Sequence, residues 1–127
     1  MDASFSCYKQ YFAKGQHFTY DLDDIARYYK DYIRLMDYWN KLFPGEIFTM
    51  HYEQIIDNPD EKISDLLKFC NVEFEESCLN FHASKRPVKT ASSEQVRQPM
   101  YKSGLDYWKN YSNNLDTLKK YFPNYDK

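Results

Sequence analysis

The sequence has very few glycines, only three in 127 residues. Gly15, Gly45 and Gly104 lie far apart, which excludes the Gly-rich loops G-x-x-x-x-G-K-[ST] and G-x-G-x-x-G that cradle phosphates. A basic excess is also missing, because 17 Lys and Arg residues stand against 19 Asp and Glu residues, for a net charge of −2. General nucleic-acid-binding proteins usually carry a clear basic excess, so we expect no nucleic-acid partner.

Long apolar runs are absent as well. No run approaches the roughly 20 apolar residues of a membrane-spanning helix, so we expect no membrane span. Residues 1–20 lack the apolar segment of a secretory signal. The cysteines are few and odd in number, with no C-x-x-C pair, which is typical of a reducing compartment and predicts a cytoplasmic location. They are Cys7, Cys70 and Cys78.

Metal-ligand spacing is missing from the three histidines, His17, His51 and His82, so we expect no metal site. Aromatic residues, in contrast, are abundant: they make up 19% of the chain and include 13 tyrosines. The apolar fraction of 43% is enough for a core and argues against intrinsic disorder.

Apolar residues at helical spacing predict most of the chain to be helical. The strongest pattern covers 22–43, where Asp21 is a good N-cap and Pro44-Gly45 ends the helix. Its apolar residues recur at steps of three and four, and we expect them to be core. They are Ile25, Tyr29, Tyr32, Met36, Trp39 and Phe43. Further helices are predicted at 4–14, from Asn58-Pro59 to about 70, and at 75–81, 103–111 and 114–122.

Only residues 46–52, EIFTMHY, predict a strand. Apolar side chains on both of its faces are typical of a buried parallel strand, which needs neighbouring strands on its edges. The sequence predicts no such neighbour. Two interpretations remain: the chain self-associates through an exposed strand edge, or the rest of the sheet lies outside this chain. We favour the second.

The segment 82–102 differs from the rest of the chain. It is basic, rich in serine and broken by Pro87 and Pro99, with no helical or strand period. A long irregular stretch of this kind in a compact domain is usually functional or disordered. Its basic residues Lys85, Arg86 and Lys89 form a cluster that would suit an anionic ligand or an ordinary solvated surface equally well.

Several short motifs follow one another in a fixed order. They are Tyr28-Tyr29 to Tyr32, Tyr52-Glu53-Gln54-Ile55, Asn58-Pro59, Thr90 to Tyr101 (T-x-S-S-x-Q-V-R-x-P-x-Y) and Trp108. In this order, over about residues 2–122, the chain resembles the C-terminal half of sulfotransferases, with the bacterial and tyrosylprotein-type branch most similar. Each motif alone is weak, but five in order over nearly the whole chain form a specific pattern.

The resemblance implies an enzyme that transfers a sulfonate group from 3′-phosphoadenylyl sulfate to a hydroxyl or amine acceptor, leaving adenosine 3′,5′-bisphosphate. It also implies an α/β fold, a P-loop-like three-layer arrangement around a parallel sheet. We expect residues 1–127 to be a single partial domain, reduced to a mainly helical fragment with the strand at 46–52. The N-terminal half, which carries the 5′-phosphosulfate loop, would be missing, so this chain alone is expected to be inactive.

The resemblance also implies nucleotide-binding positions. Asp2 and Ser6 match the end of a motif R-x-P-x-D-x-x-x-S, in which the serine holds the 3′-phosphate, and Tyr52 matches a nucleotide contact. Residues 82–102 would form the loop that closes over the nucleotide. The cofactor-binding residues expected from these matches are Ser6, Tyr52, Ser92, Ser93, Gln95, Val96, Arg97, Tyr101 and Lys102.

One departure from the family concerns the phosphate charge. Tyr101 stands where the cytosolic branch has a phosphate-binding Arg, so Arg97 or Lys102 would supply the charge. Plainer interpretations remain open: a surface serine for Ser6, a core tyrosine for Tyr52, and a solvated basic loop for Arg97 and Lys102. No catalytic residue is assigned, because the family's catalytic groups come mainly from the upstream half.

Two broader alternatives remain. The chain is a sulfotransferase fragment, or it is a non-enzymatic helical module that binds a partner protein through its aromatic faces. The segment 90–102 favours the first alternative, because an interaction module has no need of these residues at family spacing. The sequence does not identify the acceptor substrate of the transfer. Cysteine usage favours the cytoplasm, whereas eukaryotic members of the resembling family work in the Golgi lumen.

Overall fold

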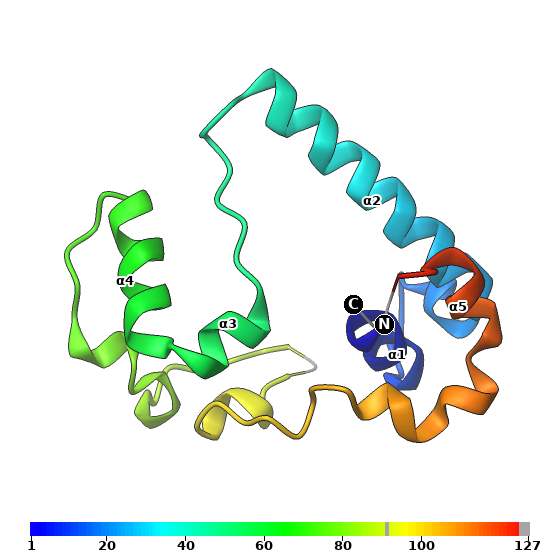
Figure 1. Cartoon of the computed structure of the whole chain (residues 1–127). Helices are drawn as coiled ribbons and strands as arrows, with labels where there is room; N and C mark the ends of the chain where they lie inside the picture. The colour runs from blue at the N-terminus through cyan, green and yellow to red at the C-terminus, as the bar shows by residue number, and fades with distance from the viewer. Residues whose placement is uncertain (91, 125–127) are drawn as a thin grey trace. The chain divides into compact units, whose positions relative to one another are not determined.

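The computed structural model describes residues 1–90 and 92–124, and every regular element within these ranges is a helix (Figure 1). The α-helices are α1 (Asp2–Lys9), α2 (Leu22–Leu42), α3 (Tyr52–Asp57), α4 (Pro59–Phe69) and α5 (Asp116–Tyr121). The 3-10 helices are η1 (His17–Tyr20), η2 (Glu76–Cys78), η3 (Phe81–Ala83), η4 (Gln95–Arg97) and η5 (Tyr107–Asn114). The chain divides into two compact units, the first made of Met1–Glu46 with Ser103–Lys127 and the second of Ile47–Lys102.

The first unit has a small hydrophobic core. Helices α1 and α5 both contact α2, and η5 contacts α1. Each contributes apolar side chains that are at most 6% exposed, and the partly buried Met1, Leu22, Tyr121 and Phe122 pack around them. The core residues are Phe5, Ala26, Trp108, Leu115 and Leu118. The first unit therefore depends on residues from both ends of the chain.

Helix α2 begins and ends close to where the sequence predicts. The Asp21 side chain accepts hydrogen bonds from the backbone N–H groups of Asp23, at 2.8 Å, and Asp24, at 3.0 Å, as an N-cap should. At the other end the helix stops at Leu42, just before Pro44 and Gly45, and Gly45 adopts a positive φ of 83°. The predicted N-cap and C-terminal stop of this helix are confirmed.

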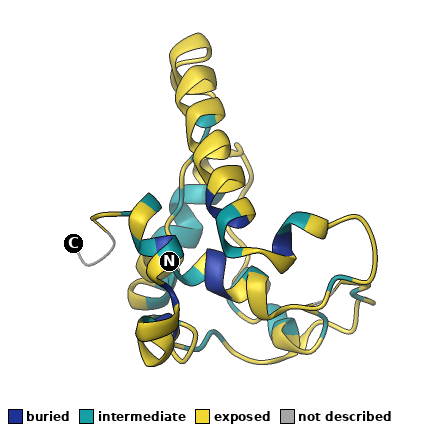
Figure 2. Ribbon diagram, turned by 90° about the vertical axis from the view of Figure 1, so that its right-hand side faces the viewer, coloured by how far each residue is buried: buried dark blue, intermediate teal, exposed yellow. Residues whose placement is uncertain are grey.

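The prediction that the apolar stripe of α2 is core is wrong for most of the helix. Ile25 is 4% exposed, but Tyr32, Trp39 and Phe43 are 47%, 41% and 51% exposed. In Figure 2, most residues in the C-terminal turns of α2 have the colour of exposed residues. The reason is length: 21 residues span about 30 Å, whereas the eight residues of α1 and six of α5 span about 12 and 9 Å. The packing of α1 and α5 therefore leaves the later turns of α2 uncovered.

The buried strand predicted at 46–52 is not present. Residues 48–51 have no regular structure, and Tyr52 is already the first residue of α3. None of residues 46–52 is buried. A strand gains its stability from the hydrogen-bond ladder to a neighbour, and the structure places no second strand among the described residues. The Phe48 ring instead lies 5.1 Å from the Phe69 ring at the end of α4.

The remaining predicted helices are shorter than expected. The segment 4–14 forms α1 over residues 2–9, and 75–81 yields the 3-10 helices η2 and η3. The two closing segments become η5 and α5. Helix α4 begins at Pro59, as predicted, with Asn58 at the N-cap position but without a capping hydrogen bond from its side chain.

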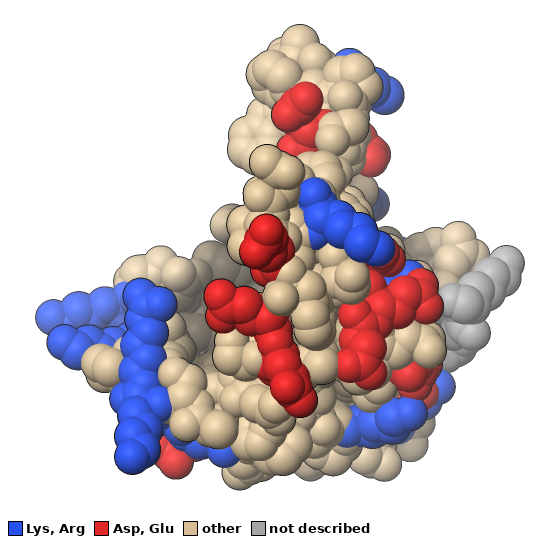
Figure 3. Space-filling model, turned by 90° about the vertical axis from the view of Figure 1, so that its left-hand side faces the viewer, with Lys and Arg blue, Asp and Glu red and all other residues tan. Residues whose placement is uncertain are grey.

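Exposed charges of both signs cover the surface that Figure 3 shows. In the second unit, Lys62 pairs with Glu61 at 2.7 Å and with Asp65 at 3.5 Å along α4. No residue of this unit that the structure describes is classed as buried, so it lacks a core comparable to that of the first unit. Within 1–90 and 92–124, no helix is long and apolar enough to cross a membrane.

Candidate functional site

Ser6 lies on α1 in the first unit, and its side chain is exposed. It is the fifth residue of a helix that begins at Asp2, so it stands one turn beyond the free N–H groups of the helix start. Asp2, the other residue of the matched motif, has a buried Oδ1 with no hydrogen-bond partner among the described residues.

The other eight predicted residues belong to the second unit, where three of them meet at α3. The Tyr52 hydroxyl donates a 3.2 Å hydrogen bond to the backbone carbonyl of Tyr101. The neighbouring Lys102 ammonium lies 2.8 Å from Oδ1 of Asp57, at the end of α3. Both side chains of this ion pair are more than 60% exposed, so it adds little stability. The two contacts nevertheless fix where the segment 82–102 ends.

The environment of Tyr52 favours its neutral hydroxyl. Partial burial raises the pKa of Tyr52 above its ordinary value of 10.0, and the nearby Tyr101 side chain raises it further. Below pH 10 the hydroxyl is therefore present as a donor to the Tyr101 carbonyl. Tyr52 is 42% exposed, so part of its ring remains open to solvent or to a ligand. Its proton is thus committed to a structural contact rather than to acid–base chemistry.

The other five residues cluster around the turn that ends in η4. The Ser93 amide donates to the Thr90 carbonyl at 3.0 Å, and the Val96 amide donates to the Ser92 carbonyl at 3.1 Å. Ser92 and Gln95 are exposed, whereas Ser93 and Val96 are half-buried. Since the Val96 amide is engaged within the turn, the hydroxyls and the Gln95 amide are the donors that this turn presents outward.

Arg97, the last residue of η4, points back to an earlier part of the same segment. Its Nη1 donates to the carbonyl of Ser84, and its Nη2 donates to the carbonyl of Arg86 at 2.6 Å. No local pattern predicts these partners, which stand 13 and 11 positions away. The guanidinium joins η4 to the basic stretch that follows η3.

A pocket of about 410 Å³ lies beside this contact. Its walls are apolar side chains, while hydroxyl and guanidinium groups of the same short segments stand among them. The lining residues are Ser77, Phe81, Ser84, Arg86, Val88, Val96 and Arg97. Two of these, Val96 and Arg97, are among the predicted cofactor-binding residues. An apolar pocket with a few polar groups is the usual form of a small-molecule site.

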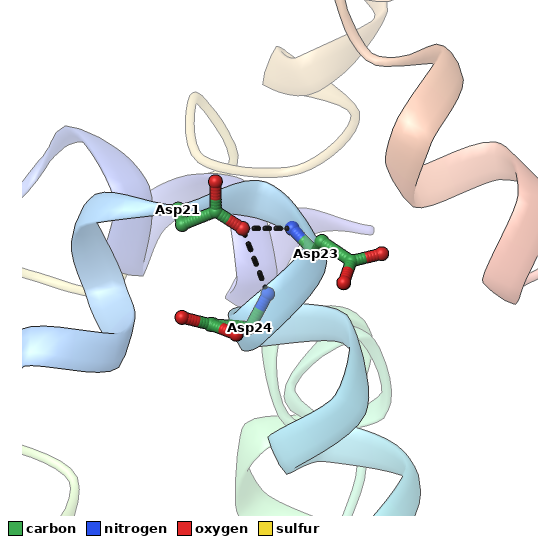
Figure 4. Close-up of side chains that lie close together, drawn as sticks. All are labelled: Asp21, Asp23 and Asp24. Atoms are coloured by element: carbon green, nitrogen blue, oxygen red, sulfur yellow. Dashed lines mark hydrogen bonds between the residues drawn. The ribbon is translucent and has the colours of Figure 1, made fainter.

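A second group of polar residues, Asp21, Asp23 and Asp24, stands at the start of α2 (Figure 4). One ligand atom from each lies within 4.8 Å of the others, which is close enough for a metal ion. However, the Asp21 carboxylate already accepts the two amide hydrogen bonds of the N-cap. Acidic residues in the first turn also stabilise the positive end of the helix dipole. These contacts account for the cluster without a metal.

We expect Asp21→Ala to lower the free energy of unfolding by about 1 kcal/mol, because two amides of α2 lose their acceptor. Asp37→Ala, an exposed site in the middle of the same helix, is the control and should change stability by less than about 0.5 kcal/mol. Chemical denaturation measures both. Addition of millimolar Mg²⁺ or Ca²⁺ should leave the unfolding midpoint unchanged, and a marked rise in the wild type that Asp21→Ala abolishes would show a metal site instead.

Comparison with known proteins assigns most of the chain to a described family. The family described as "Sulfotransferase family" matches residues 1–76. An uncharacterized protein of Aquifex aeolicus (strain VF5) is 39% identical over 119 residues, which cover 91% of this chain and 16% of that protein. The chain thus spans about one sixth of the length of this relative. No solved structure matches the chain.

Proposed function

Because the chain belongs to the sulfotransferase family, we propose that it forms part of the nucleotide site of an enzyme that uses 3′-phosphoadenylyl sulfate. In the proposed reaction the sulfur–oxygen bond to the 5′-phosphate breaks as a bond from sulfur to an acceptor oxygen or nitrogen forms. Adenosine 3′,5′-bisphosphate leaves, and the acceptor's proton passes to a base. We assign neither that base nor the acceptor to residues of this chain.

The observation that carries this proposal is that specific contacts hold the segment 82–102 in place. One end is bound through Tyr101 and Lys102 to α3, and Arg97 binds the segment to itself. A nucleotide-closing loop needs such anchors, because preorganisation reduces the entropy lost on binding. The anchored residues Arg97, Tyr101 and Lys102 belong to the segment whose sequence resembles the nucleotide-closing loop of sulfotransferases.

The proposed contacts divide by chemistry. Ser92, Ser93 and Gln95 would donate hydrogen bonds to phosphate or adenine, and Lys102 would bind phosphate as a point charge while sharing its ammonium with Asp57. The ring of Tyr52 and the side chain of Val96 would offer apolar contact to the base. Ser6 belongs to the first unit, and we do not include it in this set of contacts. We place the 5′-phosphosulfate loop outside this chain, so we expect nucleotide binding without turnover.

Titration calorimetry of the 127-residue chain with adenosine 3′,5′-bisphosphate tests the proposal. We expect a dissociation constant in the micromolar range, about −8 kcal/mol. Lys102→Ala and Ser92→Ala should each weaken binding roughly tenfold, because each removes one phosphate donor. Lys120→Ala and Ser112→Ala are the matched controls in the first unit and should bind as the wild type does.

Circular dichroism must show that each variant retains the wild-type helix content, so that lost binding is not lost folding. A folded wild-type chain that does not bind the nucleotide at millimolar concentration would contradict the proposal for this chain. Equal weakening by Lys120→Ala and Lys102→Ala would show general charge attraction rather than a site. Measurable sulfonate transfer by the chain alone would contradict the expectation that the site is partial.

The alternative function, a non-enzymatic helical interaction module, is favoured by one observation. The exposed stripe on α2 presents several large apolar side chains in a row, including Tyr32, Trp39 and Phe43. Contiguous exposed apolar patches often mark interaction sites. The calorimetric result separates the two functions, since a module of this kind has no reason to recognise adenosine 3′,5′-bisphosphate over adenosine.

A further inference from the structure

The stretch that follows η3 carries an unusual density of unpaired positive charge. Lys85, Arg86 and Lys89 are all exposed. In residues 1–90 and 92–124, no carboxylate forms an ion pair with any of the three. Arg97 adds a fourth cation beside them through its contacts with the Ser84 and Arg86 carbonyls. Neighbouring like charges repel one another, and a bound anion would relieve that repulsion.

The same stretch is held in one conformation by several hydrogen bonds. The Ser84 amide donates to the Phe81 carbonyl at 3.1 Å. The Arg86 amide donates to the Ser84 hydroxyl at 3.3 Å. The Arg97 guanidinium then donates hydrogen bonds to the backbone carbonyls of Ser84 and Arg86. Charge-assisted bonds of this kind are stronger than neutral ones, so Arg97 makes the largest contribution to this local order.

The hydrogen bonds also decide how Arg97 is used. A guanidinium has five N–H donors, and here both terminal nitrogens donate to backbone carbonyls of its own chain. Two of these five donors are therefore engaged. Arg86 also lines the pocket, and in the described hydrogen bonds only its backbone takes part. Arg86 therefore has more donors available for an anion at this pocket than Arg97 has.

We propose that Arg97 is a positioning residue that holds the Ser84–Arg86 backbone, so that the Arg86 side chain and the hydroxyl of Ser84 receive a phosphate-bearing ligand at the pocket. The Ser84 hydroxyl accepts from the Arg86 amide and retains its own proton for donation, whereas the Ser77 hydroxyl donates to the Glu75 carboxylate at 3.1 Å. The apolar walls formed by Phe81, Val88 and Val96 would take an uncharged part of the same ligand. The identification of that ligand as a nucleotide rests on the proposed function. The role of Arg97 in holding the backbone beside an anion site does not rest on the proposed function.

Limited proteolysis with trypsin tests, without any nucleotide, whether Arg97 holds the Ser84–Arg86 backbone in place. Trypsin cleaves after Lys85 and Lys89, whereas Pro87 protects the bond after Arg86. When local opening is fast relative to cleavage, the cleavage rate reports the population of the open segment. We expect Arg97→Gln to speed cleavage after Lys89 roughly tenfold, because the segment loses two charge-assisted hydrogen bonds. Arg34→Gln, an exposed arginine of the first unit, is the matched control and should cleave as the wild type does.

Two anions then test the site, inorganic pyrophosphate and adenosine 3′,5′-bisphosphate. Both should slow cleavage after Lys89 in the wild type, and neither should do so in Arg86→Gln, whose unliganded cleavage rate should match the wild type. Arg97→Lys keeps the charge but lacks the planar fork that spans two carbonyls. We therefore expect both Arg97→Lys and Arg97→Gln to bind the two anions more weakly than the wild type does. If Arg97 instead contacted the anion directly through its charge, lysine would restore the binding.

The outcomes separate the two proposals. Protection by pyrophosphate but not by the nucleotide would uphold the role of Arg97 and the anion site while contradicting the nucleotide function. Protection by neither anion, an unchanged cleavage rate in Arg97→Gln, or full rescue of binding by Arg97→Lys would each overturn the inference. Circular dichroism of every variant shows whether faster cleavage is confined to the segment, because global unfolding would also remove the helical signal of α2.

Discussion

Trp108→Ala is expected to lower the free energy of unfolding of the first unit by about 3–5 kcal/mol. Trp108 is only 3% exposed and packs in the core with Phe5, Leu115 and Leu118. The core has few members, so a large cavity cannot be filled by rearrangement of many neighbours. Since small domains are stabilised by only about 5–15 kcal/mol, this single change should remove a large share of the unit's stability. Urea denaturation followed by circular dichroism measures it.

The chain supplies its own control, because it has two tryptophans. Trp39 is 41% exposed on α2, and Trp39→Ala should cost less than about 1 kcal/mol. Each variant also leaves a single tryptophan, whose fluorescence reports on its environment. We expect red-shifted emission from Trp39 and blue-shifted emission from Trp108. Equal destabilisation by the two substitutions would contradict the core described here and would mean that the α2 stripe is covered in solution.

Tyr121→Phe is expected to lower the free energy of unfolding by about 1.5–3 kcal/mol, the usual contribution of a hydrogen bond to a charged group. The Tyr121 hydroxyl donates to Oδ1 of Asp23 at 2.5 Å and accepts from Nε of Arg27 at 3.4 Å. This links α5 to the first turns of α2. The hydrogen bond to Tyr121, followed by the charge of Asp23, raises the pKa of Arg27, so the arginine stays charged. Thermal and urea denaturation measure the loss.

A double-mutant cycle with Asp23→Ala separates this contact from the other roles of the carboxylate, which also pairs with Arg27 and lies in the first turn of α2. The coupling energy between the two substitutions should exceed about 1 kcal/mol. Tyr8→Phe, an exposed tyrosine on α1, is the matched control and should be nearly neutral. A coupling energy near zero would show that the hydroxyl and the carboxylate do not meet in solution.

Local signals predicted the parts of the fold that depend on local contacts. The Asp21 cap, the stop at Pro44-Gly45 and the start of α4 at Pro59 all involve residues within one or two turns of each other. Helix formation needs only such neighbours, so the spacing of residues along the sequence contains the necessary information. Those three positions were therefore predicted correctly from the residues alone.

The predictions that failed concern structure that needs distant partners. Residues 46–52 have the composition of a strand, but a strand requires a ladder to another segment, and composition does not specify whether one is present. The α2 stripe has the spacing of a buried face, yet burial depends on the length of what packs against it. In both cases the residues have the right local preference and lack the non-local contact.

The candidate site shows the same division. The resemblance names Tyr52, Tyr101 and Lys102 as candidates, and in the structure Tyr52 contacts Tyr101 while Lys102 contacts Asp57, both at α3. Asp57 was missed, because its pairing with Lys102 spans 45 positions and leaves no local pattern. The partners of Arg97 were missed for another reason: they are backbone carbonyls, which every residue carries, so no sequence signal marks them.

The division of the first unit between the two ends of the chain affects how it folds during synthesis. Helices α1 and α2 leave the ribosome before the second unit, and Trp108, Leu115 and Leu118, which complete their core, leave it after that unit. At about 5–20 residues per second, passage of the intervening second unit alone takes several seconds. Throughout that interval Phe5 and Ala26 lack their native neighbours, so the nascent chain is a natural client for chaperones that bind exposed apolar segments. The final step of folding must then close a loop that includes nearly the whole chain, which favours slow folding.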